Sequence, residues 1–164
     1  MARILIVGGG CRGRRLASEM TGEGHSVRAT TRTQAHRALI EESGAECWIG
    51  TPDRLATLRG ALENVTIACW LLGSATGTPQ QIADLHGSRL RFFLGEVIDT
   101  TVRGFVYEAA GTVAAEILDA GAEIVRGTGE RNAIPTALLS ADPNDLAAWL
   151  EQARATVHSL LEGR

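Results

Sequence analysis

A short apolar run that ends in glycines constrains this chain more than any other feature. Residues 4–7 carry no alternating polar side chain, which is typical of a parallel strand buried on both faces. Gly8, Gly10 and Gly13 follow at the G-x-G-x-x-G spacing, and helix-forming residues come next. In this motif the first glycine permits a tight turn, the second lets backbone approach a pyrophosphate, and the third lets the helix pack on the strand. The stretch therefore predicts a dinucleotide site at the N-terminus of the first helix.

The rest of the chain continues the alternation of helix and strand. Further strands are expected over residues 25–30, 45–49, 65–72, 104–109 and 122–125, with 136–140 as a candidate last strand. Helices are expected over residues 16–22, 33–40, 51–62, 79–101 with a break near Gly87, 113–120 with a stop at Gly121, and 142–161. Thr33, Thr51 and Asp142 are the expected N-caps. This pattern favours an α/β fold, a doubly wound parallel sheet of the Rossmann type with strand order 3-2-1-4-5-6, in a single domain over residues 1–164.

The composition excludes several classes of function. All 16 basic residues are arginines, so Schiff-base chemistry, a Walker-type phosphate lysine and a Tyr-Lys catalytic pair are ruled out. A net charge of -3 gives no footprint for nucleic acid, and no apolar stretch approaches the ~20 residues of a membrane span. No leader peptide precedes the first strand, so a soluble, cytoplasmic protein is expected. Cys11, Cys47 and Cys69 are widely spaced and lack a C-x-x-C pair, which predicts neither a disulfide framework nor a metal site, and two of them are expected to be small apolar residues of strands.

The end of the second strand indicates which dinucleotide is preferred. NAD-type sites usually place an acid there, about 20 residues past the glycines, to bind the ribose hydroxyls. No Asp or Glu lies between Gly24 and Ile40, and the strand end reads Thr30, Thr31, Arg32. Arg32, together with Arg12 in the glycine loop, is suited to hold a 2′-phosphate by charge-assisted bonds, which favours NADP over NAD. The alternative that both arginines are solvated surface residues stays open.

From the glycine loop through Arg32, and again over residues 103–110, the chain resembles the atypical short-chain dehydrogenase/reductase group of NAD(P)-binding proteins, including its NmrA-like members. The resemblance implies a cofactor site beside Thr31 that is lined by Gly8, Gly10, Cys11, Arg12, Gly13, Arg32, Thr51, Leu71 and Gly73. Thr51 departs from the pattern, because members with a full site often have an aspartate there.

The catalytic part of the resembled group is not repeated in this chain. Enzymatic members use a serine after the fifth strand and a Tyr-x-x-x-Lys motif, whereas this sequence has Ala109 and Ala110 and no lysine. Its only tyrosine, Tyr107, is expected inside a strand. The remaining candidates for a proton donor or a ligand contact are His86, Tyr107 and Glu108, with Ser74, Thr76 and Thr78 in a polar loop beside the expected nicotinamide position.

Two functions remain open at this point. The first is a small NADPH-dependent reductase of a flat or carbonyl-bearing acceptor, in which the cofactor supplies the hydride. The second is a non-catalytic NADP(H)-binding protein that passes the redox state to a partner, and the missing proton relay favours it. A fold that has lost its cofactor is a third reading, which the complete glycine loop disfavours.

The stretch over residues 90–98 is apolar on more than one side of its helix. We expect it to form a homodimer interface, because a surface helix normally keeps a polar face. In the resembled group, helices in this position often pair across a two-fold axis. The residues concerned are Leu90, Phe92, Phe93, Leu94, Val97 and Ile98. A fully buried helix in a monomer is the alternative.

Overall fold

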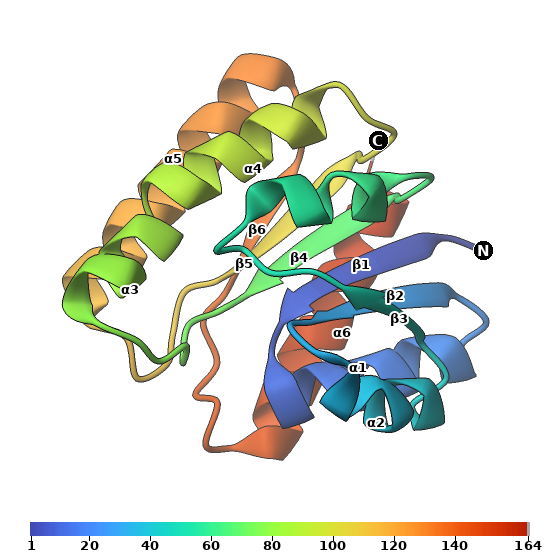
Figure 1. The fold of residues 1–164 in the computed structure, drawn as a ribbon. Coiled ribbons are helices and arrows are strands. Elements are labelled where there is room, and N and C mark those ends of the chain that lie inside the picture. Colours follow the sequence, from blue (N-terminus) through green and yellow to red (C-terminus); the bar gives the residue numbers. More distant parts are fainter. Residues whose placement is uncertain (164) are drawn as a thin grey trace.

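The computed structural model describes residues 1–163 as one sheet of six parallel strands between two layers of helices (Figure 1). The strands are β1 (Arg3–Gly8), β2 (Ser26–Thr31), β3 (Glu46–Ile49), β4 (Ile67–Leu71), β5 (Gly104–Glu108) and β6 (Thr136–Leu139). Their order is β3-β2-β1-β4-β5-β6, which confirms the predicted doubly wound topology. The strand order reverses between β1 and β4, and this is the place where such sheets bind ligands, at the carboxyl ends of the strands.

The helices divide between the two faces of the sheet (Figure 1). One face is covered by α1 (Gly10–Gly22), α2 (Arg37–Glu42) and α6 (Leu146–Glu162). The other is covered by α3 (Pro79–Leu85), α4 (Ser88–Ile98) and α5 (Ala115–Asn132), with the short 3-10 turns η2 (Leu55–Leu58) and η3 (Gly60–Leu62). A further turn, η1 (Gln34–His36), precedes α2. Among residues 1–163 no helix is both long enough and apolar enough to cross a membrane.

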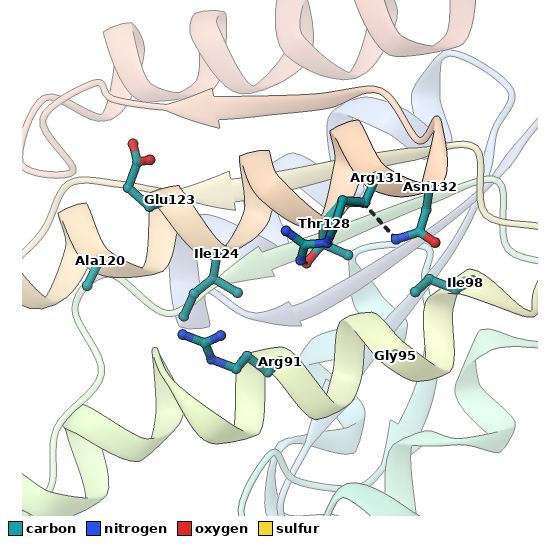
Figure 2. A pocket seen from close by; sticks show the side chains of 9 residues that line it. All are labelled: Arg91, Gly95, Ile98, Ala120, Glu123, Ile124, Thr128, Arg131 and Asn132. Atoms are coloured by element: carbon teal, nitrogen blue, oxygen red, sulfur yellow. Dashed lines mark hydrogen bonds between the residues drawn. The ribbon is translucent and has the colours of Figure 1, made fainter.

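A shallow groove runs along the outer surface where α4 and α5 lie side by side (Figure 2). Its volume is about 590 Å³. Arg91 and Ile98 face it from α4, and Ile124 and Arg131 face it from α5. The amide of Asn132 donates a hydrogen bond to the Thr128 carbonyl at its end. Every lining residue belongs to these two helices, so the groove is separate from the strand ends.

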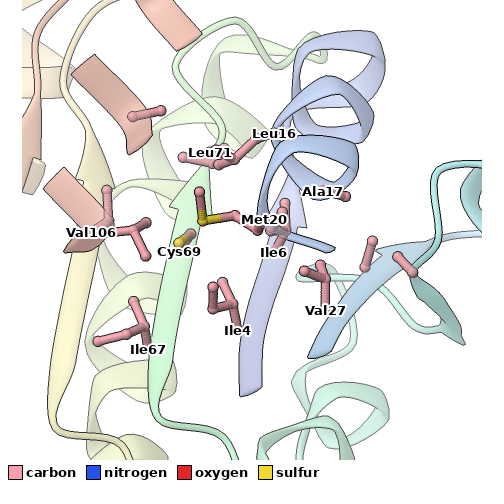
Figure 3. Packing of buried hydrophobic residues seen from close by; sticks show 14 of the residues in the cluster. Ile4, Ile6, Leu16, Ala17, Met20, Val27, Ile67, Cys69, Leu71 and Val106 are labelled. Atoms are coloured by element: carbon pink, nitrogen blue, oxygen red, sulfur yellow. The ribbon is translucent and has the colours of Figure 1, made fainter. Parts of the chain in front are cut away.

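Both faces of the central strands are buried, as the unbroken apolar runs predict. Ile4 and Ile6 of β1 pack with Met20 of α1 and Cys69 of β4 on one face (Figure 3). The alternate residues of the same strands, such as Trp70, belong to the cluster on the opposite face. This two-sided burial fixes the position of each strand end at the ligand-binding edge.

Two of the three cysteines are small apolar residues of strands, as expected. Cys47 lies in β3 and Cys69 in β4, and both are buried and free of disulfides. Burial raises the pKa of the Cys69 thiol to about 12. Cys11, at the start of α1, is free and exposed.

The prediction of a sixth strand over residues 122–125 is wrong. Those residues belong to α5, which continues through Gly121 to Asn132, and the sixth strand is β6. Gly121 does not end the helix but lies buried within it, against β5. Its missing side chain lets α5 come close to the Tyr107 hydroxyl. The predicted break near Gly87 is confirmed, since α3 ends at Leu85 and α4 begins at Ser88.

Three predicted helix starts need correction. Thr33 accepts a hydrogen bond from the Ala35 N–H and so caps the short turn η1, after which α2 begins at Arg37. No helix starts at Thr51, whose N–H is bound by the Thr57 hydroxyl, and two 3-10 turns take its place.

The last helix also starts later than predicted. Asp145, not Asp142, caps α6 by accepting the Ala148 N–H. The Asp142 carboxylate instead accepts the N–H of Asn144 within the preceding turn. The turn therefore uses one acid for itself and the next for the helix.

Candidate functional site

The glycine loop lies at the reversal of strand order, with Gly8, Gly9 and Gly10 all at positive φ. A Cβ on Gly8 would overlap the Leu72 side chain, and one on Gly13 would lie 2.8 Å from the Gly8 carbonyl oxygen. A Cβ on Gly10 would meet nothing within 4 Å. The loop is therefore packed tightly at its first and third motif glycines and open at the second, where a dinucleotide would approach.

The first turn of α1 faces this open side. Its N-cap, Gly9, has no side chain to satisfy the first amides of the helix. The first N–H groups of any helix lack intrahelical acceptors and carry the positive end of its dipole. The residues present thus fit a pyrophosphate at the head of α1.

A cleft of about 570 Å³ opens beside the glycine loop, over the carboxyl ends of β2, β3, β1 and β4; we call it the β2–β4 cleft. Gly8, Thr31, Arg32 and Leu72 line it, and Thr76 lines it from the loop after β4. Apolar residues of α3 form part of the wall, which suits a flat aromatic base as well as a polar sugar.

Arg32 is paired inside this cleft. Its Nη2 lies 2.7 Å from Oδ2 of Asp53, which belongs to the loop after β3. The side chains are 68% and 37% exposed, so the pair is solvated. The cleft therefore holds an acid after all, although it comes from the third strand's loop and not from the second strand.

A second pocket, of about 410 Å³, lies over the ends of β4, β5 and β6; we call it the β5–β6 pocket. Arg12 lines it from α1, Ser74 from the loop after β4, and Ser140, Asp142 and Asn144 from the loop after β6. The Nε atom of Arg12 is buried and has no hydrogen-bond partner within residues 1–163. Arg12 and Arg32 thus line different pockets, on the two sides of the strand-order reversal, and do not share one binding pocket.

Glu108 is a buried carboxylate at the end of β5, only 1% exposed. One oxygen accepts the Gly73 N–H at 2.9 Å, and the other accepts the indole N–H of Trp149 at 2.8 Å. Burial raises the pKa of Glu108, while these two hydrogen bonds and the charge of Arg12 oppose that rise. Its two partners tie together the end of β4 and helix α6.

His86 and Tyr107 form a buried pair beneath the cleft. His86 Nε2 lies 3.0 Å from the Leu72 carbonyl oxygen, which can only accept, so Nε2 carries the proton in the neutral ring. Nδ1 then accepts the Tyr107 hydroxyl at 2.7 Å. Burial lowers the pKa of His86 and raises that of Tyr107. At neutral pH His86 is therefore the neutral ring and Tyr107 the neutral phenol, and the one polar proton of each is directed to a protein acceptor.

The other residues predicted from the sequence have varied positions. Leu71 is buried against α1 (Figure 3), and Leu72 lines the cleft in its place. The hydroxyl of Thr51 accepts the N–H of Asp53 and so shapes the loop that carries Asp53 into the cleft. A Cβ on Gly73 would overlap the carbonyl oxygen of Ala110, so the two backbone segments lie close together. Thr78 caps α3 through a reciprocal capping box with Gln81.

Asp53 and Leu72 line the cleft but are not predicted by the sequence analysis. The dinucleotide motif usually places an acid after the second strand, where this chain has none. A signal was nevertheless present, because Asp53 follows the third strand by four residues and the ends of neighbouring parallel strands share one edge of the sheet.

Several solved structures have the same fold. Vestitone reductase from alfalfa (Medicago sativa) is 14% identical with a TM-score of 0.67, over 84% of this chain and 56% of that one. A putative NAD-dependent epimerase/dehydratase from Bacillus halodurans is 17% identical with a TM-score of 0.69, over 84% and 69%. A short-chain dehydrogenase/reductase superfamily protein from Agrobacterium tumefaciens, solved with bound NAD, is 18% identical with a TM-score of 0.66, over 83% and 48%.

This likeness confirms the Rossmann-like fold that the sequence resemblance implied. No protein-family model and no curated protein sequence matches the chain. The chain spans about half the length of vestitone reductase and of the Agrobacterium protein, at 56% and 48%. At such identities the similarity establishes the fold alone.

Proposed function

We propose that this protein binds NADP(H) at the carboxyl edge of its sheet. The observation that carries the proposal is the open space over Gly10 at the head of α1, flanked by the β2–β4 cleft and the β5–β6 pocket. The first-turn amides of α1 would hold the pyrophosphate. The two hollows on either side would take the adenosine half and the nicotinamide half.

The arginine at the end of β2 supports the phosphorylated form of the cofactor. Arg32 is exposed, lines the β2–β4 cleft and lies beside Thr31 and Thr33. A guanidinium there can form charge-assisted bonds to a 2′-phosphate. Arg12 lines the other pocket and would serve the pyrophosphate or the nicotinamide side.

A non-catalytic role is the version that the site favours. The hydroxyl of Tyr107, the Nε2–H of His86 and both oxygens of Glu108 are committed to protein partners and buried. None of these groups presents a free proton to either pocket. The protein would then report the redox state of the dinucleotide to a partner.

A reductase is the second candidate, and the β5–β6 pocket is the observation in its favour. Its 410 Å³ are lined by small polar residues next to the expected nicotinamide position. A small acceptor there could receive hydride from the cofactor, with its proton taken from water.

Binding is tested by titrating the purified protein with NADPH and NADH by calorimetry. Arg32→Ala is expected to weaken NADPH binding roughly tenfold or more and to leave NADH nearly unchanged, because a charge-assisted bond is worth ~1.5 to 3 kcal/mol. Cys11 provides a second readout, since it is the exposed one of the three cysteines. A disulfide reagent should label Cys11 in the native protein, and NADPH should slow the labelling; the Cys11→Ala variant checks which thiol reacts.

Catalysis is tested separately, by following NADPH absorbance with quinones, flavins and aldehydes as acceptors. The non-catalytic role predicts no turnover above the rate of a heat-denatured sample. Turnover that depends on protein concentration would instead establish the reductase. Failure of both dinucleotides to bind a folded sample would refute the proposed function itself.

A further inference from the structure

The pairing of Arg32 with Asp53 bears on which dinucleotide the cleft prefers. The two side chains meet at 2.7 Å, and both line the β2–β4 cleft together with Thr31 and Thr33. The charge that favours a 2′-phosphate is therefore accompanied by a charge that repels it. Both groups face the same ligand volume.

The loop that carries Asp53 is held in place by Arg89 and Thr51. Arg89 from α4 donates to the carbonyl oxygens of Asp53 at 2.7 Å and of Pro52 at 3.2 Å. Thr51 accepts the Asp53 N–H at 3.2 Å, and its hydroxyl lies 3.4 Å from Oδ2. Asp53 is thus built into the cleft wall, whereas Arg32 is the more exposed partner at 68%.

These positions lead to opposite effects on the two cofactors. A solvated ion pair is weak, so a 2′-phosphate can replace Asp53 as the partner of Arg32 at small cost. The carboxylate on this tethered loop then remains a few ångströms from the phosphate and repels it. For a ribose with a free 2′-hydroxyl, the same carboxylate is an acceptor of the kind that NAD sites use.

We propose that Asp53 is a specificity-determining residue, which holds down the preference for NADP(H) that Arg32 creates and keeps the cleft open to NAD(H). The proposal rests on the proposed function, because it concerns the same dinucleotide site. It assigns the missing acid of the second strand to the loop after the third.

The test measures the ratio of affinities for phosphorylated and unphosphorylated ligands in Asp53→Asn. Adenosine 2′,5′-bisphosphate and AMP serve as probes of the adenosine half, alongside NADPH and NADH, all by calorimetry. Removing one negative charge a few ångströms from a phosphate should raise the ratio roughly fivefold to tenfold at low salt. Screening should reduce this gain in ~0.5 M salt. Arg32→Ala should move the ratio in the opposite direction.

Glu41→Gln is the matched control. Glu41 is an exposed acid on α2, paired with Arg37 at 3.9 Å, and its replacement changes the net charge by the same amount outside the cleft. The ratio should stay near that of the wild type. Asp53→Ser is a second variant, in case the asparagine variant fails to fold.

The possible results separate the two claims. A wild-type ratio that persists in a folded Asp53 variant, with the ligands still bound, overturns the role of Asp53 and leaves the proposed function standing. An equal rise in Glu41→Gln also overturns it, because the effect would then be general electrostatics. A folded wild-type protein that binds none of the four ligands refutes the proposed function and this inference with it.

Discussion

The hydroxyl of Tyr107 occupies the space into which a side chain on Gly121 would have to project. Tyr107 lies in β5 and Gly121 in α5, so this contact sets how closely the helix approaches the sheet. The same hydroxyl donates to Nδ1 of His86, whose Nε2–H is bound by the Leu72 carbonyl at the cleft wall. A glycine in the middle of a helix is therefore linked through two buried side chains to the candidate site.

Gly121→Ala is expected to destabilise the protein by about 1 to 3 kcal/mol, because the added methyl overpacks a filled core. Gly127→Ala is the matched control in the same helix, since its Cβ would meet only the flexible end of Arg131. That variant should be neutral or more stable by about 0.5 to 1 kcal/mol. Urea denaturation of both variants measures the difference. Equal stabilities would mean that α5 moves freely away from Tyr107.

This contact also shows where sequence reasoning on the fold reaches its limit. The strand order, the buried strands and the break at Gly87 depend on local pattern and on chain topology, and all three could be predicted. The continuation of α5 through Gly121 could not, because a glycine that stops a helix and a glycine that admits a neighbouring side chain look alike in one sequence. The deciding partner, Tyr107, lies 14 positions earlier and meets Gly121 only in the folded chain.

His86 is expected to make stability depend on pH below neutrality. Burial lowers its pKa in the folded state, so the unfolded chain takes up a proton first, near its ordinary value of about 6.5. The free energy of unfolding should therefore fall as the pH falls from 7 toward 5, by up to about 1.4 kcal/mol per pH unit from this group.

His86→Gln removes this titration, so the wild type should lose its stability advantage over the variant as the pH drops. Comparing the two proteins by urea denaturation at several pH values cancels the other titrating groups. Among these is Glu108, whose raised pKa acts in the opposite direction because the folded state takes up its proton first. Parallel pH curves would show that the buried ring does not resist protonation.

Arg28 is a second position where burial predicts a large effect. It is 7% exposed in β2, and its Nη1 donates to the carbonyl oxygens of Ala61 at 2.6 Å and Glu63 at 3.2 Å. Arg28→Met would leave these acceptors without their donor, at an expected cost of about 2 to 4 kcal/mol. Its ion-pair partner Glu46 is 48% exposed, so Glu46→Gln should cost less than about 1 kcal/mol. Similar losses in both variants, measured by urea denaturation, would show that the ion pair carries the effect.

The candidate site was predictable in part for a related reason. Gly8 and Arg32 are predictable because a motif fixes their distance along the chain, and both line the β2–β4 cleft. Leu72 is not predictable, because one residue of strand length decides whether Leu71 or Leu72 faces a ligand. Asp53 is not predictable for a different reason. No sequence spacing relates Arg32 to Asp53, and only the order β3-β2-β1 brings their loops together.

The homodimer remains a prediction, on a smaller surface than the sequence indicated. Leu90, Phe93, Leu94 and Val97 are buried against the sheet, whereas Phe92 is 50% and Ile98 39% exposed. The groove between α4 and α5 adds the apolar side chain of Ile124, with Arg91, Arg131 and Glu123 beside it (Figure 2). An isologous contact could pair these opposite charges across a two-fold axis and cover the exposed apolar residues.

Phe92→Glu should therefore weaken dimerisation at least tenfold, because a carboxylate would be buried at the contact. Phe93→Glu is unsuitable as a test, since Phe93 is 2% exposed in the core and its replacement would unfold the protein. Ala155→Glu on α6, which covers the opposite face of the sheet, adds the same charge at an exposed position and should leave the mass unchanged. Sedimentation at micromolar concentration measures the mass of the wild type and of the Phe92→Glu and Ala155→Glu variants. A wild type that is monomeric throughout would show that Phe92 and Ile98 are simply solvated, as isolated apolar surface residues often are.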